Sequence, residues 1–173
     1  MKIKKLSGGL VDLAEDIVVF GKKCGADEVE VSIVEGREFF VDVRLGNVEN
    51  LVEAGSRHLS VRVIKDKKTA YATSSDLARE TWKRLLRNAV RRSVLANQDD
   101  CAGLPPLTAG KTDSCVLKLC DPQIYELNPD RKIQLALVTE RIALEDRRIT
   151  NSHGASFITN EVTTILANSN GFL

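Results

Sequence analysis

The sequence contains few of the residues that enzymes commonly use for metal or nucleophilic chemistry. Only two histidines, His58 and His153, occur in its 173 residues, and no H-E-x-x-H or similar metal-binding motif is present. Two isolated histidines cannot supply a three-ligand zinc site, and each is predicted to lie on the surface, His58 at a strand start and His153 in a turn. The motifs G-x-S-x-G and G-x-G-x-x-G and the P-loop are also absent. A hydroxyl and a distant base could still pair, but the residues alone nominate no catalytic, cofactor-binding or metal site.

The four cysteines lack the spacing of a zinc site or a disulfide framework. No C-x-x-C pair occurs, and Cys115 and Cys120 are five positions apart, which would place them on opposite faces of a strand. With Cys24 and Cys101, they are predicted to be free thiols in a reducing compartment.

Long apolar runs and a strong net charge are missing as well. The basic start at residues 1–5 precedes no apolar signal region, and no stretch is long enough to span a bilayer, so we expect a soluble cytoplasmic protein. A net charge of +1 predicts no overall attraction to nucleic acid or membrane. With 43% hydrophobic residues, a chain of this length can bury roughly 70% of its unfolded surface without disulfides or metals.

The stretch from residue 27 to 74 has the alternation of a β-meander. Apolar residues occupy every second position in three runs, with charged or small polar residues between them. Turn-forming pairs follow each run, which predicts hairpins between neighbouring antiparallel strands. We therefore expect four to five strands with one apolar face. The apolar positions are Val29, Val31, Ile33, Phe39, Val41, Val43, Leu45, Leu59, Val61 and Val63, and the predicted turns are Glu35-Gly36, Gly46-Asn47, Gly55-Ser56 and Asp66-Lys67.

Two amphipathic helices flank this segment and are predicted to cover its apolar face. In the first, apolar residues recur at helical spacing from Leu10 to Cys24, and Gly25 stands where a left-handed C-terminal cap is expected. The second is expected over about 77–96, with N-cap candidates at 74–76. The predicted fold class is α+β, with helices packed on one face of an antiparallel sheet.

The second predicted helix carries the main concentration of charge. Lys83, Arg87 and Arg91 recur at i, i+4 and i+8, and Glu80 is the one anion among six cations. The region 79–92 could bind phosphate or an acidic partner such as nucleic acid. The alternative is a solvated face balanced by the acidic sheet surface, which the lack of stacking aromatics and of a glycine-rich loop favours. The cations are Arg79, Lys83, Arg84, Arg87, Arg91 and Arg92.

A polar connection at 99–112 separates the helix, meander and helix of 1–98 from the segment 113–173. Its Asp99-Asp100 pair is predicted to be loop solvation rather than a cation site, because no histidine or third carboxylate is near. Beyond it we expect a short strand at 115–119, a helix that starts with Asn128-Pro129 and ends near 147, and a β-hairpin of 149–159 and 161–168. The segment 113–173 belongs to the same domain or begins a second layer.

An internal repeat places Asn-Ser-His-Gly at 151–154 and Asn-Ser-Asn-Gly at 168–171. Asparagine at the first position and glycine at the fourth suit type I turns, so a structural role is predicted. The alternative is a polar ledge that contacts a ligand or a partner.

Six short blocks lie at 25–31, 43–49, 72–77, 99–105, 148–156 and 167–172. Taken in this order they resemble a known family, and the resemblance spans about 10–172. Each is weak singly, but six in the same order make a specific signature. The chain resembles the N-terminal half of the TldD/PmbA family, the modulators of DNA gyrase, which are classed as metallopeptidases. The opening block and the block that ends with Gly103-Leu104-Pro105 are closer to the PmbA branch, also called TldE.

The resemblance implies a part in peptide hydrolysis. In the family, zinc lies on an H-E-x-x-x-H helix downstream of this region and only in the TldD branch, so no family metal ligand or catalytic residue maps onto this chain. Family members pair TldD-like and PmbA-like subunits into a heterodimer around a peptide-cleaving chamber, used in maturing a peptide antibiotic and degrading an antitoxin. Unfolded peptide is expected to enter as an added strand. The expected partners are a TldD-like subunit or a second copy, and extended peptide, with no membrane.

The resemblance also predicts that this chain is a fragment, because it stops at Leu173 in the middle of a family motif. We expect a non-catalytic domain of a PmbA-like subunit that holds no zinc, hydrolyses no peptide alone, and packs, dimerises or helps enclose substrate. The alternatives are a nucleic-acid- or gyrase-binding module that uses 79–92, and a general protein-interaction scaffold.

Overall fold

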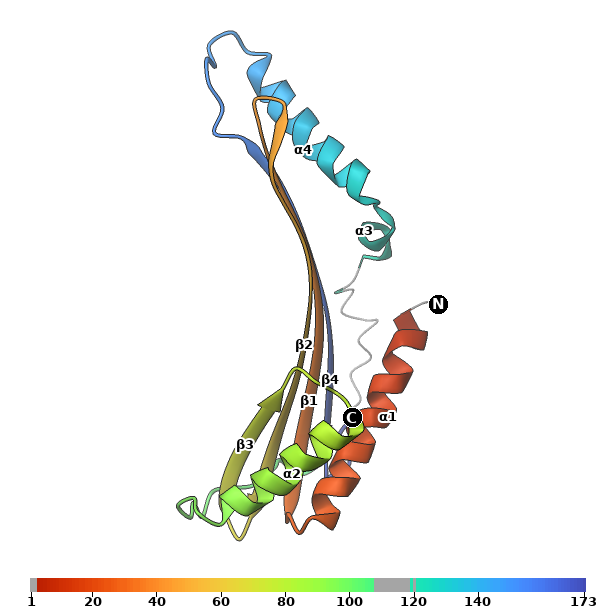
Figure 1. Cartoon of the computed structure of the whole chain (residues 1–173), viewed down its shortest axis with the longest axis vertical. Coiled ribbons are helices and arrows are strands. Elements are labelled where there is room, and N and C mark those ends of the chain that lie inside the picture. Colours follow the sequence, from red (N-terminus) through yellow and green to blue (C-terminus); the bar gives the residue numbers. More distant parts are fainter. Residues whose placement is uncertain (1–2, 108–118, 120) are drawn as a thin grey trace. The chain divides into compact units, whose positions relative to one another are not determined.

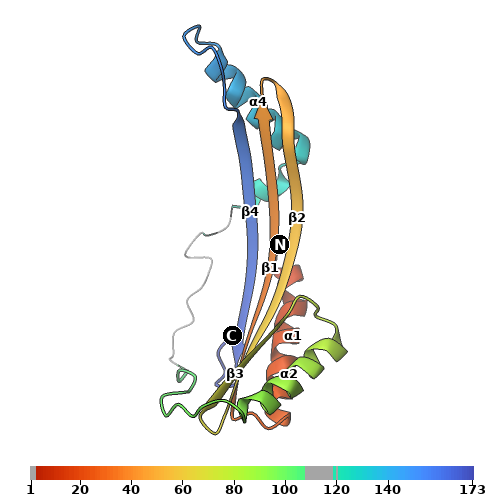
Figure 2. The ribbon, with the colours of Figure 1, turned by 60° about the vertical axis from the view of Figure 1, so that its left-hand side comes forward.

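The computed structural model describes residues 3–107, 119 and 121–173 (Figure 1). Its strands form a four-stranded sheet in the order β3-β2-β1-β4, and Figure 2 shows β1 between β2 and β4. The predicted fold class, α+β with an antiparallel sheet and helices, is confirmed. The elements are α1 (Ile3–Lys23), β1 (Glu28–Arg44), β2 (Asn47–Lys65), β3 (Lys68–Ser74), α2 (Arg79–Ser93), α3 (Pro122–Glu126), α4 (Pro129–Leu144) and β4 (Ala155–Asn168).

β1 and β2 continue through two of the four predicted turns. The turns at Glu35-Gly36 and Gly55-Ser56 are wrong, because these residues lie inside the two strands. A glycine can be accommodated within a strand, and here the cross-strand pairing holds the chain extended: the Glu35 carboxylate accepts a 2.6 Å hydrogen bond from Arg57 Nε.

The other two predicted turns are present. Asp66 and Lys67 join β2 to β3 with φ of 48° and 60°. Leu45 and Gly46 join β1 to β2 with φ of 48° and 76°, so this turn is centred one residue earlier than predicted. Two residues with positive φ are the usual connection of a tight β-hairpin. Leu45, predicted on the apolar face, is instead 57% exposed in the turn.

The C-terminal segment predicted as a hairpin contributes a single strand, because β4 continues through Asn160, where the reversal was expected. One residue is too short for the usual β-hairpin connection of two or more. Both ends of β4 lie beside β1 instead. The Ser156 hydroxyl donates to the Asp42 carboxylate, and the Ser169 N–H, just after β4, donates to the Val29 carbonyl at 2.8 Å.

The signals at the ends of α1 and α4 are confirmed. Gly25, after α1, has a φ of 94°. The Asn128 side chain caps α4 by accepting a 2.8 Å hydrogen bond from the Arg131 N–H, with Pro129 as the first helical residue. α4 ends at Leu144, three residues before the predicted end.

α2 starts later than predicted, with Ala78 as its N-cap. Asp76 does not cap the helix. Its carboxylate accepts hydrogen bonds from the Ala78 N–H at 2.8 Å and the Thr81 hydroxyl at 2.6 Å, so 74–76 form the turn that precedes the helix. The short helix α3 was not predicted. The strand predicted at 115–119 lies outside the described residues except for Leu119.

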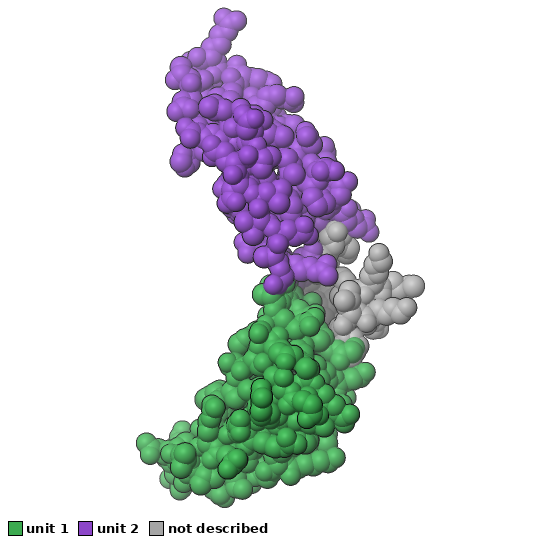
Figure 3. All heavy atoms as spheres, in the orientation of Figure 1, with its two compact units in different colours: residues 1–36, 56–109, 162–173 green, residues 37–55, 110–161 purple. Residues whose placement is uncertain are grey.

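The chain divides into two compact units, which Figure 3 colours separately. Unit 1 comprises residues 1–36, 56–109 and 162–173, and unit 2 comprises 37–55 and 110–161. β1, β2 and β4 each contribute residues to both. The unit boundaries in β1 and β2 fall at Gly36 and Gly55, the glycines of the two turns that the sequence predicts wrongly.

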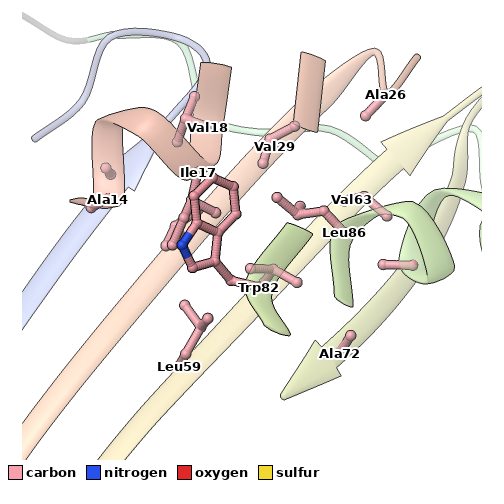
Figure 4. Packing of buried hydrophobic residues seen from close by; sticks show 14 of the residues in the cluster. Ala14, Ile17, Val18, Ala26, Val29, Leu59, Val63, Ala72, Trp82 and Leu86 are labelled. Atoms are coloured by element: carbon pink, nitrogen blue, oxygen red, sulfur yellow. The ribbon is translucent and has the colours of Figure 1, made fainter. Parts of the chain in front are cut away.

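The core of unit 1 lies between α1, α2 and one face of the strands. Phe20 of α1 and Trp82 of α2 meet edge to face, with ring centroids 5.5 Å apart and planes at 82°, a geometry that the aromatic quadrupoles favour. Figure 4 shows the Trp82 ring over Ile17 and near Leu59. The odd positions 29–33 of β1 and 59–63 of β2 are buried, as the alternation predicts. The fully buried members of this cluster are Ala14, Ile17, Val29, Val31, Ile33, Leu59, Val61, Val63, Leu86 and Ala89.

The core of unit 2 is smaller and lies under α4. Phe39, Val41 and Val43 of β1 are buried together with Ala136 of α4, and Phe157 of β4 packs against them. Burying a phenylalanine or valine side chain stabilises a fold by roughly 1.5–3 kcal/mol, so three such residues are enough to fix the helix on this face.

A buried carboxylate ties α4 to the turn between β1 and β2. Glu140 is 2% exposed, and its two oxygens accept hydrogen bonds from the N–H groups of Leu45 at 2.8 Å and Gly46 at 3.0 Å. Buried N–H groups need such partners. The Gly46 N–H above all, with help from Leu45, Ser152 and Arg44, holds the pKa of Glu140 below its ordinary value, although burial acts in the opposite direction.

Replacing Glu140 by glutamine should lower the melting temperature near neutral pH, because the amide group leaves a turn N–H facing another donor. Since the pKa of Glu140 is lowered on folding, its contribution to stability is present above the ordinary glutamate value of about 4.3 and is lost as pH falls through the lowered value. The melting-temperature difference between wild type and Glu140→Gln, followed by circular dichroism, should be largest near pH 7 and shrink towards pH 3. Glu145→Gln, exposed at the end of α4, is the control. A melting-temperature difference that stays constant over this range would contradict a stabilising role of the Glu140 hydrogen bonds to the Leu45-Gly46 turn.

Gly154 lies where unit 2 has no room for a side chain. A Cβ atom there would stand 2.4 Å from the Val43 carbonyl oxygen, and its φ of 109° disfavours other residues. Gly154→Ala should destabilise the fold by more than about 1 kcal/mol in chemical denaturation. Gly9→Ala in α1, where a Cβ meets no atom within 4 Å, should be neutral or stabilise by up to about 1 kcal/mol. Equal effects of the two substitutions would argue against this close contact.

Candidate functional site

In unit 1, the last of the six blocks, 167–172, is hydrogen-bonded to the start of β1. The Val29 N–H donates to Ser169 Oγ at 3.0 Å, and the Asn168 side chain accepts a 2.9 Å hydrogen bond from the Asn170 N–H. The Gly171 N–H donates to the Asn168 carbonyl at 3.2 Å, the bond that closes a β-turn. The turn predicted at 168–171 is therefore present, and these groups bind the domain's own backbone.

The loop at 99–105 is held by two other blocks. The Leu104 N–H donates to the Glu28 carboxylate at 2.8 Å, and Asn170 Nδ2 donates to the Pro105 carbonyl at 3.0 Å. Ala102 and Leu104 are buried against Ile64. Three blocks far apart in the sequence thus meet in unit 1 and fix one another by hydrogen bonds.

In unit 2, the first copy of the repeat has a different geometry from the second. The type I turn predicted at 151–154 is wrong, because this segment leads without a reverse turn into β4. Ser152 Oγ accepts from the Gly154 N–H at 2.8 Å, and the Ser152 carbonyl accepts from Arg44 Nε at 3.3 Å. Instead of forming a turn, this segment runs close to β1, with Gly154 beside the Val43 carbonyl.

The side chains that could bind a metal or act in catalysis are far apart in the part of the chain that the structure describes. No group of three or more His, Cys, Asp and Glu side chains there could hold a metal ion. His58 and His153 are exposed, in unit 1 and unit 2 respectively. Asp99 accepts from the Cys101 N–H, and Asp100 accepts from Gln98 Nε2, both at 2.9 Å, as loop residues do. The described residues therefore do not fit the donor set that the family's zinc requires.

The cations of α2 split into a packed and an exposed group. Lys83 Nζ and the Arg87 guanidinium lie 5.8 Å and 5.4 Å from the Phe20 ring centroid, and Lys83 is also 3.8 Å from Glu80. A cation over the face of an aromatic ring is attracted by the ring, so these contacts stabilise the packing of α2 on α1. Arg84 and Arg91 are exposed, and Arg87 is exposed as well despite its contact with Phe20. Of the predicted ladder, Lys83 and Arg87 contact α1 through the Phe20 ring.

The described cysteines, Cys24 and Cys101, are free thiols. Burial raises the pKa of the Cys24 thiol, with Arg87 acting in the opposite direction, which makes it less reactive. Cys101 is exposed in the loop, whereas Cys115 and Cys120 lie outside the described residues.

Unit 2 contains a cavity of about 420 Å³, lined in part by the start of α4. Lys132 and Phe39 in its lining are buried, and Thr159 is half-buried beside them. Lys132 is 8% exposed, and its Nζ lies 3.1 Å from Thr159 Oγ1 and 4.7 Å from the Phe39 ring centroid. Sequence reasoning missed this site. Its available signal was a pair of cations, Arg131 and Lys132, in the first turn of a helix, where the dipole disfavours positive charge.

None of the helices in the described ranges is long and apolar enough to cross a membrane.

Comparison with known proteins gives consistent matches. A family model described as PmbA/TldA metallopeptidase domain 1 matches residues 29–93, which include β1, β2, β3 and α2. The chain is 31% identical to metalloprotease PmbA of Escherichia coli O157:H7 over 149 residues, or 86% of this chain. It is 30% identical to the metalloprotease PmbA homolog of Haemophilus influenzae over 160 residues, or 90% of this chain. It spans about a third of these relatives, 33% and 34% of their lengths.

Two solved structures share the fold. TldE from Thermococcus kodakarensis superimposes with a TM-score of 0.76 at 22% identity, over 92% of this chain and 35% of that one. A modulator of DNA gyrase from Bacteroides thetaiotaomicron gives 0.77 at 23% identity, over 93% and 37%. With the family model and the curated relatives, these matches establish that the chain belongs to the TldD/PmbA family, as an N-terminal domain of it.

Proposed function

We propose that this chain is the non-catalytic N-terminal domain of a PmbA-like subunit in a TldD/PmbA-type metallopeptidase complex. The single observation that carries the proposal is the similarity to two PmbA metalloproteases, which extends over 86% and 90% of this chain but only a third of theirs. In this role the domain packs against a TldD-like subunit or a second copy and helps enclose extended peptide. The hydrolytic chemistry, and its zinc, belongs to the TldD-like partner.

Two features of the fold support a packing role. Polar groups of the blocks bind the domain's own backbone, as at Glu28 and Ser169. The edge strand β4 has 14 residues with Glu161 as its one charged residue, so few charges oppose the addition of an extended peptide or a partner strand. We place the protein in the cytoplasm, which suits the free thiols of Cys24 and Cys101.

The purified 173-residue chain should bind no stoichiometric zinc and hydrolyse no peptide, and it should co-purify with a TldD-like subunit when the two are expressed together. Metal content is measured by mass spectrometry, and hydrolysis is followed on an unfolded peptide. The TldD-like subunit, which carries the H-E-x-x-x-H helix, is the positive control for zinc. One tightly held zinc per copy of this chain would reject the proposal. Capture of other proteins but not of the TldD-like subunit would favour a general interaction scaffold.

A nucleic-acid- or gyrase-binding module is the second candidate, and the exposed cations of α2 are the observation that favours it. Arg84, Arg91 and Arg92 are solvent-exposed, although Lys83 and Arg87 stack on Phe20. Phosphate contacts of this kind make affinity fall steeply with salt.

We expect no salt-dependent binding of duplex DNA, because the aromatic rings beside α2, Phe20 and Trp82, pack in the core of unit 1 and offer no stacking platform. Fluorescence anisotropy with labelled DNA at about 20 mM and about 200 mM salt tests this. Should binding occur, the double variant Arg84→Glu/Arg91→Glu is compared with Lys23→Glu/Arg147→Glu, which makes the same change in net charge at exposed sites elsewhere. Loss in the first variant alone would establish the α2 surface as a nucleic-acid site.

A further inference from the structure

Lys132 combines three features that are individually unfavourable for a cation. It is 8% exposed, and burying a charge destabilises a fold unless the charge is paired. The ion pairs within 4 Å among the described residues do not include it. It also lies in the first turn of α4, where the helix dipole presents positive charge. Positions where several local rules are broken together are expected to be functional or strained sites.

The contacts of Lys132 leave part of its hydrogen-bonding capacity available. An ammonium group has three N–H donors, and one is directed to Thr159 Oγ1. The Phe39 ring, 4.7 Å away, stabilises the charge but accepts no conventional hydrogen bond. Because Lys132 lines the 420 Å³ cavity, an anionic group that enters can bind Nζ directly.

The remainder of the lining has the opposite charge. Glu38, Glu53, Glu126 and Glu161 contribute four carboxylates against the single guanidinium of Arg37. This lining disfavours a dianion such as phosphate. It favours a ligand that brings one carboxylate to Lys132 and a cationic group to the glutamates. A cavity of this volume falls within the range of small-molecule sites.

We propose that this cavity binds the free carboxylate of a short peptide that also carries a cationic side chain, with Lys132 as the carboxylate-binding residue. The choice of a peptide over other carboxylates rests on the proposed function. The carboxylate preference itself rests on Lys132 alone and is tested without a partner subunit, so its failure would leave the family role intact.

The experiment compares two probes, acetyl-Gly-Gly-Lys with a free C-terminal carboxylate and the same peptide with a C-terminal amide. They are titrated into the 173-residue chain, and binding is followed by NMR chemical-shift changes at residues of the cavity. The amide form is the more cationic probe, so attraction to the acidic lining alone would make it bind better. We expect the reverse, with the carboxylate form binding about tenfold more tightly, as for a hydrogen-bonded charge pair.

Two substitutions test whether Lys132 causes the preference for the carboxylate form. Lys132→Met keeps an unbranched side chain, one atom shorter, but removes the charge, and it should abolish the preference for the carboxylate form. Glu126→Gln, at an exposed position of the lining, should weaken both peptides and keep the preference. Equal binding of the two peptides, stronger binding of the amide, no binding, or a preference that survives Lys132→Met would each overturn the proposal. If Lys132→Met does not fold, the wild-type comparison of the two peptides decides.

Discussion

The fold depends on the burial of alternate residues in two stretches of β1, 29–33 and 39–43. Val29, Val31 and Ile33 supply the core of unit 1, and Phe39, Val41 and Val43 supply that of unit 2. Because side chains alternate with a strict period of two, a shift of one residue in the pairing of β1 would expose both sets at once. The helices follow from this constraint, since α1 and α2 cover the first set and α4 covers the second.

Side-chain carboxylates, amides and hydroxyls have a shared task in this domain, which is to bind backbone groups where a strand or a loop ends. Glu140 does so for the Leu45-Gly46 turn, Glu28 for the loop at Leu104, and Ser169 for the start of β1. Groups engaged in this way are oriented by the backbone and have little capacity left for a substrate. Motif blocks rich in polar residues can therefore specify a scaffold.

Lys132 differs from these groups because its principal contacts are an aromatic ring and one hydroxyl. The same helix, α4, thus carries two buried charges with different surroundings. Glu140 near its C-terminal end is satisfied by two backbone N–H groups, whereas Lys132 at its start faces a cavity. The contrast separates the stabilising role of Glu140 from the recognition role proposed for Lys132.

The sequence by itself determined the alternating apolar face, the Asn128-Pro129 helix start and the hairpin at Asp66-Lys67, because periods, caps and tight turns are encoded by neighbouring residues. Only the tertiary structure decided that Gly36, Gly55 and Asn160 lie within strands, because pairing with a distant strand outweighs a local turn signal. The burial of Lys132 also required the fold. Its surroundings come from Phe39 and Thr159, which reach it only when α4 packs on β1 beside β4.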